Sequence, residues 1–136
     1  FPYTTLFRSG VGAQNALKEA GIRSFVATSK PQVHAEAICQ KFGIAPYVEA
    51  IAGPAVGGTD TKADVMRRIL AGLGPVEKGD AVMVGDRRFD IIGAHELGLP
   101  VIYVTYGYGD EAERKAFQPD YTAATVGDLK QLLLQA

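Results

Sequence analysis

The stretch Ala81-Val82-Met83-Val84-Gly85-Asp86-Arg87-Arg88-Phe89-Asp90 organises the rest of the chain. Its apolar run is much shorter than a membrane span, and it ends in a glycine that precedes two aspartates four residues apart. A buried parallel strand has this form, because both faces of such a strand pack against helices. The stretch therefore predicts a central strand that brings two acidic side chains to one edge of a sheet.

Composition limits the kind of protein that can carry this strand. The chain has 136 residues, of which 47% are hydrophobic and 21% charged, which suits one domain with a real core. Fourteen basic and fifteen acidic residues give a net charge of −1, so no bulk field attracts nucleic acid or a membrane surface, and a small molecule is the expected partner. Cys39 is the only cysteine, which excludes an internal disulfide and fits a reducing cytoplasm. The sequence shows no apolar stretch of membrane-spanning length and no export leader.

Strand-like and helix-like segments alternate along the chain. This order predicts right-handed crossovers and a parallel sheet between two layers of helices, which is a three-layer, Rossmann-like α/β fold. In such a sheet, ligands bind beyond the carboxyl ends of the strands. The predicted strands are 22–27, 47–52, 81–84, 100–105 and 121–123, and the predicted helices are 11–20, 32–42, 62–73, 91–97, 111–117 and 126–134.

The first nine residues, FPYTTLFRS, stand apart from this pattern. They have no periodicity and no helix cap, and they look like the translation of a sequencing-adapter oligonucleotide fused in frame to a coding sequence. We therefore expect residues 1–9 not to be native, and residues 10–136 to be a partial domain whose beginning is missing. The alternative is an ordinary N-terminal segment.

Asp86 and Asp90 are the first candidates for chemistry. One follows a strand and the other lies in the first turn of the next helix, so both can face the same point. Two carboxylates at about 4 Å repel each other by roughly 4 kcal/mol at an effective dielectric constant of 20, and a bound cation reverses that repulsion. Oxygen ligands with room for water and phosphate suit Mg²⁺. The alternative is that Asp86 is a capping residue and Asp90 is an ordinary acid at a helix N-terminus.

Three further residues lie at helix starts. Thr28 and Ser29 follow a strand and precede a helix, where a hydroxyl and backbone N–H groups can hold a phosphate oxygen, although Ser29 can equally act as a helix cap. Lys62 opens the third helix after a glycine-rich loop. The helix dipole disfavours a cation there, so its position predicts an anion or carboxylate nearby; the alternative is a solvated lysine.

The remaining polar features carry weaker signals. Arg87 and Arg88 flank the aspartates, and Arg87 is expected to form an ion pair there; the alternative is simple solvation. The loop Tyr106-Gly107-Tyr108-Gly109 either shapes a pocket or simply turns the chain. His34 and His95 lie on predicted helices without a partner at ligand spacing, so both are expected to serve the surface or the packing.

Taken together, the segments 27–31 and 84–90, with Lys62 between them, resemble the second, third and fourth motifs of the haloacid dehalogenase-like (HAD) phosphatases. The similarity covers 10–136 and is closest to the phosphoglycolate phosphatase and bacterial 5'-nucleotidase branches. The loop 53–58 departs from the family, which usually carries an acidic residue there, and this leaves the subfamily open.

The resemblance implies that Thr28 and Ser29 bind the phosphoryl group, that Lys62 neutralises charge, and that Asp86 and Asp90 hold Mg²⁺. The family's nucleophile is the first aspartate of an Asp-x-Asp-x-Thr strand, and its second aspartate is the general acid and base. No two aspartates of this chain are separated by a single residue, so both groups are absent. The resemblance therefore implies an incomplete HAD-like core without its nucleophile strand or its cap domain, with two unpaired central strand edges and poor stability.

The expected function of the full-length parent is Mg²⁺-dependent hydrolysis of a small phosphomonoester, a nucleoside monophosphate or phosphoglycolate, through an aspartyl-phosphate. The fragment itself is expected to be inactive. Dehalogenation is disfavoured, because halide displacement needs no cation. The alternative from another class is a non-catalytic, receiver-like α/β module that binds Mg²⁺; a receiver carries its acidic pair early in the chain, whereas this pair is late. Substrate, cap type and oligomeric state are left open.

Overall fold

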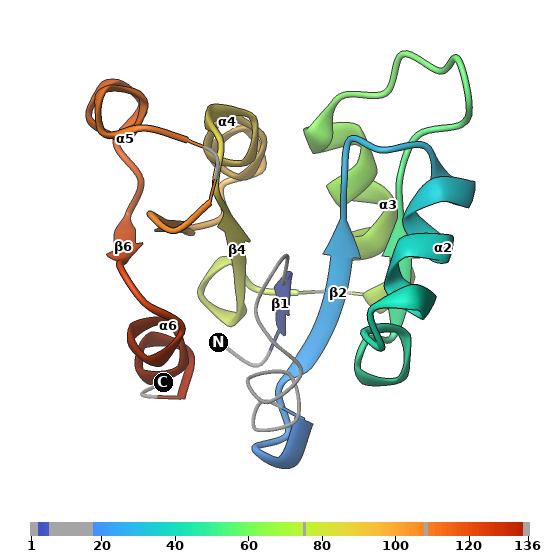
Figure 1. The fold of residues 1–136 in the computed structure, drawn as a ribbon, viewed down its shortest axis with the longest axis horizontal. Helices are drawn as coiled ribbons and strands as arrows, with labels where there is room; N and C mark the ends of the chain where they lie inside the picture. The colour runs from blue at the N-terminus through green and yellow to red at the C-terminus, as the bar shows by residue number, and fades with distance from the viewer. Residues whose placement is uncertain (1–2, 6–17, 75, 108, 135–136) are drawn as a thin grey trace.

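A computed structural model of the chain describes residues 3–5, 18–74, 76–107 and 109–134. Figure 1 shows an α/β fold built on a parallel sheet with the strand order β3-β2-β1-β4-β5-β6. The strands are β1 (Tyr3–Thr5), β2 (Arg23–Ala27), β3 (Ala50–Ala52), β4 (Ala81–Gly85), β5 (Val101–Val104) and β6 (Tyr121–Ala123). The helices are α2 (Gln32–Lys41), α3 (Lys62–Leu73), α4 (Arg88–Glu96), α5 (Glu111–Phe117) and α6 (Val126–Leu134), with short 3₁₀ helices at Ala45–Tyr47 and Lys78–Asp80.

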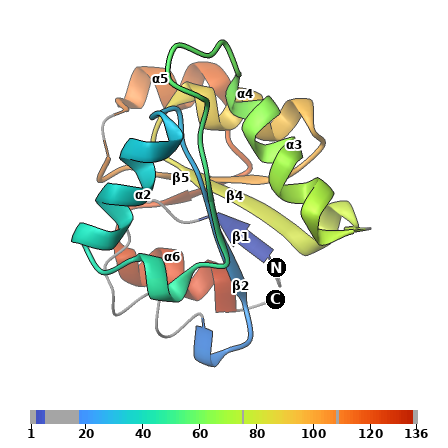
Figure 2. The same ribbon diagram turned by 90° about the vertical axis from the view of Figure 1, so that its right-hand side faces the viewer.

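The sheet divides two hydrophobic cores, as the predicted three-layer fold requires. Met83 and Tyr103 belong to the core that also contains side chains of α3 and α4. Val84 and Ile102, the neighbours of those residues along β4 and β5, belong to the core completed by α6. Successive residues of a strand point to opposite faces, so an unbroken apolar strand such as β4 supplies both cores. Figure 2, turned by 90°, shows α6 on the side of the sheet away from α3 and α4.

The middle of the sheet differs from the expectation of two unpaired strand edges. Tyr3–Thr5 form β1, which pairs in parallel with Arg23–Phe25 of β2 on one side and with Ala81 and Val82 of β4 on the other. The prediction of two unpaired central strand edges is therefore wrong. Two parallel edges with free N–H and C=O groups accept any extended segment within reach, whatever the origin of its sequence. Periodicity cannot indicate a strand of three residues, and β1 is held by its hydrogen bonds to β2 and β4.

Other predicted elements shift at their ends. The strand expected at 47–52 begins only at Ala50, because Ala45–Tyr47 form a 3₁₀ helix. Helix α4 begins at Arg88, three residues before the predicted start. Helix α2 has Pro31 at its N-cap with no side-chain cap, so the capping role suggested for Ser29 is wrong. Most of the helix predicted at 11–20 lies outside the described residues. Within those residues, no helix has the length and apolar character needed to cross a bilayer.

Candidate active site

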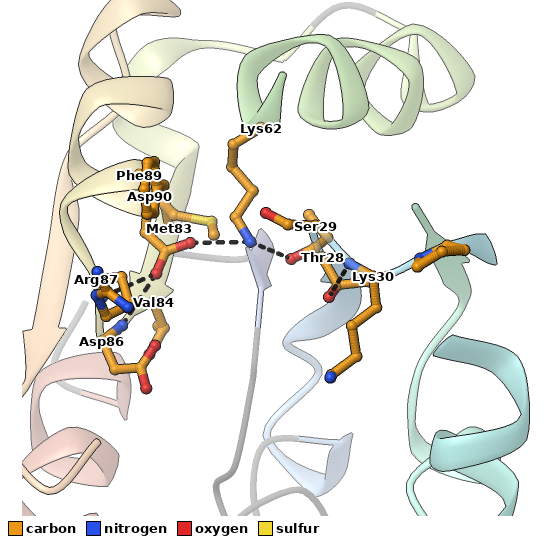
Figure 3. A pocket seen from close by; sticks show the side chains of 12 residues that line it. Thr28, Ser29, Lys30, Lys62, Met83, Val84, Asp86, Arg87, Phe89 and Asp90 are labelled. Carbon is orange, nitrogen blue, oxygen red and sulfur yellow. Dashed lines mark hydrogen bonds and ion pairs between the residues drawn. The ribbon is translucent and has the colours of Figure 1, made fainter. Parts of the chain in front are cut away.

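The residues singled out from the sequence meet in one cleft of about 550 Å³ at the carboxyl ends of β2 and β4. Figure 3 shows Lys62 reaching down from α3 into the space between Asp90 and the end of β2. Because parallel strands end at the same sheet edge, residues up to 62 positions apart become neighbours. The cleft is lined by Ala27, Thr28, Ser29, Lys30, Pro31, Lys62, Met83, Val84, Asp86, Arg87, Phe89 and Asp90.

The N-cap of α3 fixes the position of Lys62. Thr61 is the N-cap, and it forms a capping box in which its side chain accepts the Asp64 N–H while the Asp64 carboxylate accepts the Thr61 N–H. This fixes Lys62 as the first helical residue. Its Nζ lies 3.0 Å from Asp90 Oδ1 and donates to the Ala27 carbonyl at 3.1 Å. The carboxylate predicted beside Lys62 is therefore present.

Asp90 is an internal acid that organises the turn after β4. Its carboxylate is buried, and Oδ2 accepts the backbone N–H groups of Asp86 at 3.0 Å and Arg87 at 3.2 Å. Gly85 makes room for it, because a Cβ at that position would overlap the Asp90 side chain. Both Asp90 oxygens thus already have protein partners, one in Lys62 and one in the turn.

Asp86 is held through its backbone. The Gly109 N–H donates to the Asp86 carbonyl at 2.9 Å, and the residue is only 6% exposed although it lines the cleft. Gly107 of the loop after β5 lies so close that a Cβ there would overlap the Asp86 carboxylate. Among the described residues of this loop, none lines the cleft, and Gly107 and Gly109 instead contact Asp86.

The donor set fits Mg²⁺ in a limited way. Asp86 offers a carboxylate at the cleft, and in Figure 3 it points away from Lys62 and Asp90. Among the described residues no three His, Cys, Asp or Glu side chains are grouped to hold a metal ion. Mg²⁺ in enzymes is commonly held by one or two carboxylates, with water and substrate phosphate completing its shell, so Asp86 suits that ion.

Thr28 and Ser29 stand across the cleft from the aspartates. Thr28 is buried, and its Oγ1 accepts the Lys30 N–H at 3.1 Å, which leaves the hydroxyl hydrogen available to donate. Gly53 packs tightly behind this turn, because a Cβ there would overlap the Lys30 carbonyl. Ser29 is exposed and lines the cleft.

Glu113, near the start of α5, has no counterpart in the sequence analysis. Its Oε1 accepts the backbone N–H of Arg88 at 2.7 Å and the Nε of Arg87 at 3.2 Å, so Arg87 has the acidic partner predicted for it. Nearby, the Tyr103 hydroxyl is buried and has no hydrogen-bond partner among the described residues. Burial raises the pKa of Tyr103, and the charges of Glu113 and Asp86 raise it further.

The fold and this cleft agree with a known family. Residues 61–129, just over half of the chain, match the HAD-hydrolase-like family. The chain therefore belongs to the haloacid dehalogenase-like hydrolase superfamily.

Individual relatives have several activities. The chain is 38% identical over 119 residues to a 5'-nucleotidase of Pseudomonas aeruginosa, covering 87% of this chain and 53% of that one. It is 32% identical over 108 residues to a phosphoglycolate phosphatase of Rhodospirillum rubrum, covering 79% and 44%. It is also 38% identical over 128 residues to the tyrosine-protein kinase PtkA of Mycobacterium tuberculosis, covering 91% and 44%.

A solved structure from Clostridium acetobutylicum, described as a predicted phosphatase, superposes with a TM-score of 0.86 at 38% identity. The match covers 92% of this chain and 58% of the other. The chain thus spans about half the length of the curated relatives it matches.

Proposed function

We propose that this chain is the phosphate-binding and metal-binding part of a Mg²⁺-dependent phosphatase that acts on a small phosphomonoester, a nucleoside monophosphate or phosphoglycolate. The observation that carries the proposal is the meeting of Thr28, Lys62 and Asp86 in one cleft at the strand ends. The named relatives include a 5'-nucleotidase and a phosphoglycolate phosphatase. Family membership favours this function over a receiver-like module.

Each residue has a role that follows from its chemistry. The Thr28 hydroxyl donates to a phosphate oxygen, with the exposed Ser29 beside it. The Lys62 ammonium, held by Asp90, offsets negative charge on the phosphate. Asp86 holds Mg²⁺. The bound ion would supply positive charge at the phosphate oxygens, which lowers the energy of the charged transition state.

The nucleophile is the part that this chain does not supply. In the proposed reaction of the longer protein an aspartate attacks phosphorus, the ester P–O bond breaks and the alcohol leaves, and water then hydrolyses the aspartyl-phosphate to free phosphate; no Asp-x-Asp pair is present in the sequence. The chain itself is therefore proposed to be inactive. A cytoplasmic location is proposed on a separate ground, the single cysteine of the sequence.

The proposal is tested by measuring phosphate release from AMP and phosphoglycolate by two proteins, this chain and a longer form of it. This chain is expected to release none, and the chain extended by its upstream coding sequence is expected to release phosphate with Mg²⁺ and to stop on addition of EDTA. Asp86→Asn in the extended protein should abolish turnover, whereas Asp128→Asn, a change at an exposed acid of α6, should leave it unaltered. Turnover that survives both EDTA and Asp86→Asn would refute the proposal.

A further inference from the structure

We infer that Glu113 is a positioning residue that sets the Mg²⁺ affinity of Asp86. Glu113 lies 27 residues after Asp86 in the sequence, in helix α5, and is not among the residues that line the cleft. The inference rests on the proposed function, because the role of Asp86 as a metal ligand belongs to that proposal.

The turn that presents Asp86 is held by two carboxylates from different elements. Asp90 accepts the N–H groups of Asp86 and Arg87. Glu113 accepts the next one, the Arg88 N–H, at 2.7 Å. Three consecutive backbone donors therefore end on carboxylates, and hydrogen bonds to charged acceptors are stronger than those between neutral groups.

The contacts of Glu113 fix the position of its carboxylate. Its side chain is only 11% exposed, and besides the Arg88 N–H it meets the Arg87 Nε at 3.2 Å and the Arg88 Nη1 at 3.6 Å. Its negative charge also lies at the N-terminus of α4, where the helix dipole favours an anion. Its own N–H is bound to the N-cap Asp110 at 2.8 Å, which ties the carboxylate to the start of α5.

The same α5 segment is joined to Asp86 by a second route. The loop between β5 and α5 donates the Gly109 N–H to the Asp86 carbonyl. Glu113 and this loop are therefore both hydrogen-bonded to the backbone of the Asp86 turn. Removing a group that hydrogen-bonds to a metal ligand and orients it typically weakens metal binding by about 10–100-fold.

The test is a Mg²⁺ titration of the full chain by calorimetry, with Glu113→Ala, Glu113→Gln and a matched control, Glu111→Gln. Glu111 belongs to the same helix but is exposed and pairs with Arg114, away from the turn. Glu113→Ala should weaken Mg²⁺ binding by about tenfold or more. Glu113→Gln keeps an acceptor for the Arg88 N–H and should lose less, while Glu111→Gln should bind as the parent does.

Hydrogen exchange measured without metal separates positioning from local packing. In Glu113→Ala the amides of Asp86, Arg87 and Arg88 should all exchange faster, whereas loss of one local contact would affect Arg88 alone. If the unsubstituted chain binds Mg²⁺ and folded Glu113→Ala has the same Mg²⁺ dissociation constant, this inference is overturned and the proposed function stands. If the unsubstituted chain binds no Mg²⁺, the inference and the proposed function are both overturned.

Discussion

Replacing Asp90 by alanine should destabilise the chain more than the loss of an ordinary surface acid. The Asp90 carboxylate is 5% exposed and has three partners: the Lys62 ammonium at 3.0 Å and the N–H groups of Asp86 and Arg87. Removing it leaves a largely buried ammonium without its counter-ion and two backbone donors without acceptors.

The magnitude follows from these partners. Removing one member of a buried ion pair costs about 3–5 kcal/mol. Lys62 keeps its hydrogen bond to the Ala27 carbonyl, which places the cost near the lower end of that range. The two backbone donors left without an acceptor increase this cost, but by less than the sum of their separate contributions. The free energy of unfolding should thus fall by about 3–4 kcal/mol, a large share of the roughly 5–15 kcal/mol of a typical domain.

Urea unfolding followed by circular dichroism at neutral pH measures the change. Asp90→Asn keeps one carbonyl acceptor for the turn and loses the charge, so it should cost about 1.5–3 kcal/mol. The double variant Lys62→Met/Asp90→Ala should be more stable than the two single losses predict, because no uncompensated charge remains. The exposed Asp128→Ala is the control. A loss in Asp90→Ala no larger than in this control would refute the reasoning.

Two further predictions concern the loop after β5 and the far side of α4. Gly107→Ala places a Cβ against the Asp86 carboxylate and should weaken Mg²⁺ binding by calorimetry, whereas Gly72→Ala, at an open position of α3, should bind Mg²⁺ normally and stabilise the chain by about 0.5–1 kcal/mol. Burial alone would raise the pKa of Asp120, but its hydrogen bonds to His95 and to the first N–H of β5 outweigh that and lower the pKa below the ordinary 3.8. A lowered pKa stabilises the fold above pH 3.8, so Asp120→Asn should lower the free energy of unfolding by up to about 1 kcal/mol at pH 7. The difference in unfolding free energy between the variant and the unsubstituted chain should disappear as the pH falls through the folded pKa. A difference that stays constant with pH contradicts this.

Local signals in the sequence were enough to predict most of the fold. Helices α3, α5 and α6 and strand β6 have the predicted bounds, because each carries its own periodicity or cap. Thr61 and Asp64, for example, form a capping box that fixes the start of α3. The strand β1 was not predicted although Tyr and Thr favour strands, because three residues carry no periodicity; in the structure it pairs with β2 and β4.

The site was predictable to the extent that it depends on strand ends. Thr28, Lys62 and Asp86 were expected at one sheet edge and do line one cleft. Glu113 was missed because its partners lie 25 and 26 residues away, while a glutamate in the first turn of a helix reads as an ordinary surface acid. The loop containing Gly107 was singled out, but its close approach to Asp86 was not predicted, since that approach comes from a loop path that the sequence does not specify.

The two aspartates that look equivalent in the sequence are unequal in the structure. Both oxygens of Asp90, which was predicted to be a Mg²⁺ ligand with Asp86, have protein partners: Oδ1 lies beside the Lys62 ammonium and Oδ2 accepts backbone N–H groups of the turn. Asp86 has its backbone N–H and C=O fixed, while its carboxylate lines the cleft. A carboxylate on an immobilised backbone loses little entropy when it binds an ion, which favours Asp86 as the ligand. The spacing of four residues therefore places the proposed Mg²⁺ ligand beside a carboxylate that holds its turn, and Glu113 accepts the next backbone N–H of the same turn.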